Sequence, residues 1–294
     1  MELPAGPRFE LPLTPPYDWP ALRSFLAARA IHGAEVIDDG RYVRTLRVDG
    51  RTGWLAVGPG ASAEVLSMEL SPSLATAAPA IVERARHAFD LDADPGAIAR
   101  ALGPLAAPSP GLRVPHAFDP FETTVRAVLG QQISVKGAST LAGRFVAAFG
   151  EPVATPHDTL THLPPTAPQV AALSADAIAG IGMPGSRAAT ILGLAAAKAE
   201  RRLVLYPRSD HAEATARLLA LPGIGPWTAE YVAMRVLGSA DAFPASDLGV
   251  RMALGGISAR EAEARAEAWR PYRSYAVMHL WRSLGGPSES PVGG

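Results

Sequence analysis

The sequence predicts an α+β protein in which an antiparallel-sheet domain (residues 1–110) precedes an all-helical domain (residues 111–294). Three observations lead to this prediction. Two-residue alternation over 36–57 gives way to helical spacing beyond residue 115. The stretch GPLAAPSPGLRVP at 103–115 is rich in proline and glycine, as linkers are. The 294 residues also suffice for about two domains.

The elements of the first domain follow from local signals. Asp18 is placed to cap a helix with Pro20 in its first turn. Asp49-Gly50 is typical of a tight turn between two alternating strands. The expected strands cover 36–39, 41–48, 52–57 and 63–70, and the expected later helices cover 77–89 and 95–102.

The second domain shows no strand pattern. Val125, Val128 and Leu129 recur at helical spacing, as do Leu141 and Phe145. A proline-rich connection over 151–168 interrupts the helices. The expected helices cover 121–129, 135–149, 174–180, 187–199, 211–219, 227–237, 248–254, 259–268 and 272–284.

Composition excludes several classes of protein. With 48% hydrophobic and 19% charged residues, the chain is not of the disordered type. A net charge of −1 excludes a protein that is basic over its whole surface. Residues 1–110 carry 10 basic and 13 acidic side chains, whereas residues 111–294 carry 17 and 15. The second region therefore leans toward an anionic partner.

The absence of cysteine excludes disulfides, a thiolate zinc site, an iron–sulfur cluster and a cysteine nucleophile. No two of the seven histidines have the i, i+4 spacing of a helical metal site. The closest pair, His157 and His162, is interpreted as facing solvent. We expect no required metal or cofactor.

The N-terminal residues lack the basic and apolar regions of a secretory signal, and no apolar run is long enough to span a membrane. We therefore expect a cytoplasmic monomer without a membrane or protein partner.

The most informative segment is LPGIGPWTAEYVAMRV at 221–236. Gly223 and Gly225 allow a tight turn between two helices and close approach of another chain. Free amides at the turn and at the next helix form a site where phosphates bind. Ile224 is expected to pack between the helices. The alternative is a plain helix–helix turn, which often contains glycine.

This segment resembles the helix–hairpin–helix of the DNA glycosylase superfamily. Within it the chain is similar to the alkylation-repair DNA-3-methyladenine glycosylase II (AlkA-type) family, and the resemblance covers nearly the whole chain. Besides the hairpin, the segments that carry it are PPYDW (15–19), FLAARA (25–30), VRAVLGQQIS (125–134), GMP (182–184) and WRPYRSYAVMHLW (269–281).

The resemblance implies that Asp247, in DAFPASDLGVRMAL, is the catalytic carboxylate. From the residues alone, Ser246 or Asp247 could equally cap the helix that starts at Leu248. A base pocket for an extruded base is implied at Trp227, Tyr231, Trp281 and Phe25. Core packing is the alternative for these aromatics, and chiefly for Phe25.

The resemblance also implies how DNA is held. Its implied contacts are made by Gly223, Ile224, Gly225, Thr228, Gln131 and Gln132, and Arg187 is either a further contact or an exposed arginine. The carbonyls implied to hold a monovalent cation are those of Leu219, Leu221 and Ile224. Three positions depart from the family pattern and put the lesion range in doubt: Gln132 replaces an apolar wedge, Ser246 a carboxylate and Leu248 an aromatic.

Bifunctional members of the superfamily carry a nucleophilic lysine where this chain has Trp227, and no lysine follows Lys198. The sequence therefore predicts a monofunctional glycosylase that flips alkylated bases, of the 3-methyladenine and 7-methylguanine type, out of double-stranded DNA in base excision repair. A non-catalytic helix–hairpin–helix module that senses damaged or bent DNA is the alternative. An unrelated enzyme with a similar turn is a third reading.

Overall fold

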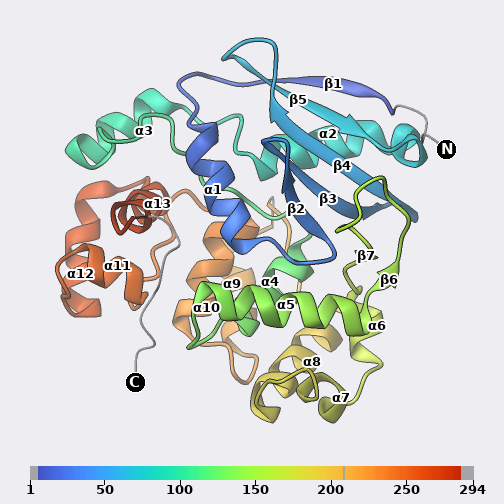
Figure 1. The fold of residues 1–294 in the computed structure, drawn as a ribbon. Coiled ribbons are helices and arrows are strands. Elements are labelled where there is room, and N and C mark those ends of the chain that lie inside the picture. The colour runs from blue at the N-terminus through green and yellow to red at the C-terminus, as the bar shows by residue number, and fades with distance from the viewer. Residues whose placement is uncertain (1–5, 208, 286–294) are drawn as a thin grey trace.

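The computed structural model describes residues 6–207 and 209–285 (Figure 1). Five antiparallel strands form a sheet in the order β1-β5-β4-β3-β2. The strands are β1 (Arg8–Pro12), β2 (Glu35–Asp38), β3 (Arg41–Val48), β4 (Arg51–Pro59) and β5 (Val65–Leu70). The α+β prediction is confirmed.

The strongest local sequence patterns correspond to the elements they predicted. Asp49 and Gly50 both have positive φ, at 51° and 76°, which is the geometry of a tight hairpin turn between β3 and β4. The Asp18 side chain accepts a hydrogen bond from the Ala21 amide and caps the first helix. Strand β1 was not predicted, because only Leu11 of its five residues is buried.

One helix lies between β1 and β2 in the chain, and the other helices follow β5. In the first region they are α1 (Trp19–Arg29), a 3₁₀ segment (Pro72–Ala77), α2 (Ala78–Ala88), α3 (Pro95–Leu102) and a short 3₁₀ turn (Gly103–Leu105). The second region contains α4 (Pro120–Leu129), α5 (Val135–Phe149), α6 (Ala167–Ala171), α7 (Ala175–Ala179), α8 (Gly185–Ala199), α9 (His211–Leu219), α10 (Pro226–Val232), a π-helical turn (Ala233–Leu237), α11 (Leu248–Ala253), α12 (Ala259–Ala266), a 3₁₀ turn (Glu267–Trp269) and α13 (Arg273–Ser283).

The second region is not wholly helical. Strands β6 (Glu151–Pro152) and β7 (His162–Leu163) pair within the proline-rich connection, which returns to the sheet. Leu160 of this connection packs on the sheet face formed by Val43, Trp54 and Ala56. His157 does not simply face solvent, since its Nδ1 lies 2.9 Å from an Asp38 oxygen and its ring meets Trp54 edge-on.

Helix α1 belongs to both hydrophobic cores. Its Trp19 and Leu22 pack in the core beneath the sheet, whereas Phe25 packs in the core of the helical region. Figure 1 shows α1 between the sheet and α5, and it contacts β2, β3 and α5. The fold thus carries residues of the first region to the centre of the second. The boundary at residue 110 stays a prediction.

An ion-paired network joins the two regions. Arg44 of β3 donates to Glu122 of α4 at 2.6 Å and lies 3.4 Å from Glu35 of β2, whose carboxylate also accepts a short bond from the Tyr42 hydroxyl. In the described part of the chain, no helix is long and apolar enough to cross a membrane.

Candidate active site

Asp247 lies where the loop after the π-helical turn enters α11. Its Oδ1 accepts a hydrogen bond from the Val250 amide at 2.9 Å, so the helix-capping interpretation is correct. Capping does not occupy the whole group. The Trp227 indole donates to Oδ2 at 2.9 Å, and the Trp281 indole donates to Oδ1 at 2.8 Å. The half-buried carboxylate is thereby fixed in orientation from two helices.

The four aromatic residues expected in the base pocket form one cluster, with this acid at its edge. The rings of Trp227 and Tyr231 stack at 5.4 Å between centroids, and Tyr231 lies 6.3 Å from Trp281. Phe25 stacks on Trp281 at 6.1 Å with the planes 18° apart. The cluster therefore draws on α1, α10 and α13. Phe25 and Tyr231 are also core residues, at 8% and 7% exposure, so core packing holds for both, and their contact with an extruded base stays a prediction.

Two arginines that sequence reasoning missed complete the cluster. The Arg29 guanidinium lies 3.7 Å above the centre of the Phe25 ring and 5.6 Å from that of Trp281. Arg235 lies 4.8 Å from the Phe25 ring and donates to the Tyr231 hydroxyl at 3.0 Å. Each arginine follows its aromatic partner by four residues on a helix, a spacing that places them side by side. That spacing was the available signal.

These positive charges change the acidity of the cluster. Burial alone would raise the pKa of the Tyr231 hydroxyl, but the charges of Arg235, Arg126 and Arg29 outweigh burial and lower it. Burial also lowers the pKa of Arg29 to about 9, helped by Arg126 and Arg235 and opposed by Tyr231 and Asp247. The aromatic site is thus backed by fixed positive charge.

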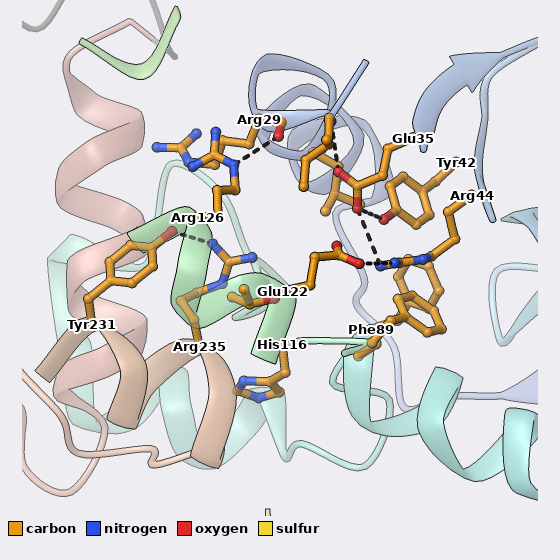
Figure 2. A pocket seen from close by; sticks show the side chains of 15 residues that line it. Arg29, Glu35, Tyr42, Arg44, Phe89, His116, Glu122, Arg126, Tyr231 and Arg235 are labelled. Carbon is orange, nitrogen blue, oxygen red and sulfur yellow. Dashed lines mark hydrogen bonds and ion pairs between the residues drawn. The ribbon is translucent and has the colours of Figure 1, made fainter. Parts of the chain in front are cut away.

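A small polar cavity lies behind the cluster, at the junction of the two regions. Figure 2 shows Tyr231 and Arg235 on one side of it and Glu122 and Arg44 on the other. The cavity has a volume of about 40 Å³, which has room for water but not for a purine. Burial raises the pKa of Glu122 to about 7, against the opposing effect of Arg44.

The hairpin between α9 and α10 has the close approach that its glycines predict. Gly223 has φ +84°, and a Cβ built on it would lie 1.9 Å from the Thr190 hydroxyl oxygen of α8. Gly225 faces open space, with nothing within 4 Å of such an atom. Ile224 is buried between the helices, and its amide donates to the Leu221 carbonyl at 3.1 Å.

Of the predicted DNA contacts, Gln131 and Thr228 are already bonded to each other. The Gln131 amide nitrogen donates to Thr228 Oγ1 at 3.0 Å and to the Gly223 carbonyl at 2.9 Å. Arg187 is not a free surface arginine, because it donates to the Gln131 carbonyl at 2.7 Å. Gln132 is exposed. Contact of these residues with DNA stays a prediction.

Metal-binding groups are scarce. Among the described residues, no group of three or more acidic or histidine side chains could hold a metal ion. Binding of a monovalent cation by the hairpin carbonyls of Leu219, Leu221 and Ile224 stays a prediction. The Leu221 carbonyl already accepts one amide, which leaves one lone pair for a cation.

Comparison with known families accounts for most of the chain. Residues 8–119 match the model of the AlkA N-terminal domain. Residues 125–273 match that of the HhH-GPD superfamily base excision DNA repair protein. The chain is 36% identical to Escherichia coli DNA-3-methyladenine glycosylase 2, over 92% of this chain and 95% of that protein.

A second relative is longer. The chain is 44% identical, over 96% of its length, to the probable bifunctional transcriptional activator/DNA repair enzyme AlkA of Mycobacterium tuberculosis. It spans only 57% of that protein. Among solved structures, a 3-methyladenine DNA glycosylase from Archaeoglobus fulgidus superposes with a TM-score of 0.82 at 23% identity, covering 94% of this chain and 99% of that one, which shows a shared fold. Residues 125–273, which hold Asp247, Trp227 and the hairpin, therefore belong to the HhH-GPD superfamily of base excision DNA repair proteins, and an AlkA N-terminal domain precedes them.

Proposed function

We propose that this protein is a monofunctional DNA glycosylase that extrudes alkylated bases from double-stranded DNA and cleaves their glycosidic bonds, in base excision repair. The observation that carries the proposal is the Asp247 carboxylate held by two indoles at the edge of an aromatic cluster. Membership of the repair superfamily and the name of the Escherichia coli relative support it.

Asp247 acts on the sugar. Cleavage of a glycosidic bond develops positive charge on the deoxyribose, and a fixed carboxylate beside C1′ stabilises that charge. Both oxygens of Asp247 already accept N–H bonds, so the group needs no reorientation as the charge appears. It also orients the water that completes the hydrolysis.

The aromatic cluster selects the base. Alkylation at N3 or N7 makes a purine cationic, and each good contact with an aromatic face favours a cation by about 0.5–2 kcal/mol. Trp227 supplies such a face. Guanidinium groups already lie over the other three rings, with Arg29 over Phe25 and Trp281 and Arg235 over Phe25 and Tyr231, so these rings add shape more than cation binding. We propose 3-methyladenine and 7-methylguanine as the lesions removed.

The hairpin holds the DNA strand. The open space at Gly225 and the free amides at the start of α10 suit a phosphate, and the carbonyls of Leu219, Leu221 and Ile224 suit a monovalent cation that bridges to it. A lyase reaction would need a lysine amine as nucleophile. Trp227 stands where bifunctional members carry that lysine, and the only lysines of the chain are Lys136 and Lys198.

Because the proposed substrate is chromosomal DNA, we propose that the protein acts in the cytoplasm, in association with the nucleoid.

The test is release of 3-methyladenine and 7-methylguanine from methylated duplex DNA by the wild type and by Asp247→Asn. We expect the wild type to release both. The variant should lose at least about 100-fold in single-turnover rate, since it removes a charge that acts in the transition state. Its affinity for a duplex with an abasic analogue should stay within threefold. A wild type that binds this duplex but releases no base would instead be the non-catalytic damage sensor.

A further inference from the structure

The loop that joins α4 to α5 has an unusual backbone. Gln132, exposed at its tip, has φ +58°. A residue other than glycine adopts this left-handed conformation at a cost, and it persists where the surroundings hold it. Such positions gather at functional sites.

The preceding residue, Gln131, is what holds the loop. Its carbonyl accepts a bond from Arg187 Nη2 of α8 at 2.7 Å. Its side-chain amide donates to the Gly223 carbonyl at 2.9 Å and to Thr228 Oγ1 at 3.0 Å. Both amide hydrogens are thus used within the protein, and Thr228 is only 2% exposed. The two amide hydrogens of Gln131 are therefore engaged by the hairpin, which leaves neither of them for a phosphate.

From these contacts we propose that Gln131 and Arg187 are positioning residues. They lock Gln132 in its left-handed conformation, aim its side chain at the gap left by the extruded base, and keep it in fixed register with the hairpin. The inference rests on the proposed function, in which a base leaves the duplex. It takes the exposed Gln132, which stands where the family resemblance implies a wedge, as the residue that fills this gap.

The turn of the hairpin also has contacts of its own. It keeps the bond from the Ile224 amide to the Leu221 carbonyl, and Gly223 packs directly on Thr190. We call the bonds from Gln131 and Arg187 the clamp. Loss of the clamp should impair filling of the gap and leave binding of the strand by the hairpin intact. If Gln131 instead contacted a phosphate directly, its replacement would weaken both gap filling and strand binding.

The experiment uses a duplex in which 2-aminopurine lies opposite a tetrahydrofuran abasic analogue, so that fluorescence reports stacking of the orphan base. An undamaged duplex reports the strand grip. We expect Gln131→Met and Arg187→Gln each to reduce the fluorescence change at saturation, because loss of even one hydrogen bond lowers the ratio of filled to unfilled gaps about fivefold. Affinity for the undamaged duplex should stay within twofold. Arg144→Gln is the matched control, since Arg144 also donates to a loop carbonyl, that of Ile181 at 3.2 Å, and should behave as wild type.

A second arm tests the backbone conformation. Asparagine adopts left-handed φ more readily than glutamine, so in a Gln132→Asn background the effect of Arg187→Gln should shrink to less than half. An undiminished effect there, an unchanged fluorescence signal, or equal losses on both duplexes would each overturn the proposal. If Gln131→Met fails to fold, Arg187→Gln decides alone.

The probe duplex has no base to excise. A protein that releases no base can therefore still give the fluorescence result, and failure of the proposed function is distinguished from failure of the clamp.

Discussion

Asp247 illustrates how far single residues could be predicted. Resemblance identified the acid and the four aromatic residues, and the structure brings them together. It did not indicate that both indoles donate to the carboxylate, because ring orientation depends on the packing of α10 against α13. Arg29 and Arg235 were missed for a related reason: an arginine in a helical pattern is usually solvated, and here stacking on Phe25 holds each one inward.

The indole bonds give a prediction at this scale. Trp281→Phe keeps an aromatic ring but removes the N–H that holds Asp247 Oδ1, so the acid becomes less well oriented. Hydrogen bonds to charged groups contribute about 1.5–3 kcal/mol, so the single-turnover excision rate should fall by about tenfold or more. Trp269→Phe, whose ring packs 6.4 Å from Phe243, is the control and should keep the wild-type rate. Equal rates for Trp281→Phe and wild type would remove the positioning role.

Single elements were predicted well where they bury one face and poorly where they do not. Strand β1 is mostly exposed, and β6 and β7 lie among prolines, so none of the three strands showed an alternating pattern in the sequence. The helix expected at 227–237 is α-helical only to Val232 and continues as a π-helical turn. Such a turn inserts one extra residue, which periodicity over a short segment does not reveal, and it often occurs at functional sites.

The hairpin gives a prediction at the scale of elements. Gly223→Ala places a Cβ against the Thr190 hydroxyl in a backbone conformation that alanine avoids, so it should cost more than about 1 kcal/mol of unfolding free energy. Affinity for undamaged duplex should fall with it. Gly193→Ala in α8 meets no atom within 4 Å and should instead stabilise by about 0.5–1 kcal/mol. Denaturant titration with parallel binding measurements separates the two. A neutral Gly223→Ala would contradict the packing described for the turn.

At the scale of the whole molecule, the order of regions was predictable but their interlocking was not. Helix α1 shares its residues between two cores, and α3 adds Ile98 and Leu102 to the helical core. The buried Arg44–Glu122 pair links strand to helix across the junction. Contacts between segments so far apart in sequence leave no periodic signal, so only the folded structure reveals them.

The compact core also predicts acid sensitivity. Burial, with a smaller effect of Arg282, lowers the pKa of His279 to about 4, whereas an unfolded histidine titrates near 6.5. Between these values the unfolded chain binds the proton and the folded chain does not. This contribution to stability is therefore complete above about pH 6.5 and is lost as the pH falls toward 4.

Melting temperatures measured from pH 7 to pH 4 test this contribution. His279→Gln cannot titrate, so its melting temperature should decline less over this range than that of the wild type. His32→Gln is the control, because His32 is exposed, and it should follow the wild-type curve. A decline for His279→Gln as steep as that of the wild type would show that this histidine is not kept neutral by the fold.

Helix α1 supplies one wall of the proposed base site from outside the segment that contains the proposed catalytic acid. Phe25 and Arg29 come from this helix, whereas the acid, both tryptophans and Tyr231 come from residues 227–281. Changes at positions 25 and 29 can therefore reshape the room and charge offered to a damaged base while the acid and the turn stay untouched. Substitutions at these two positions are therefore the simplest way, in nature or by engineering, to change which damaged bases the protein accepts.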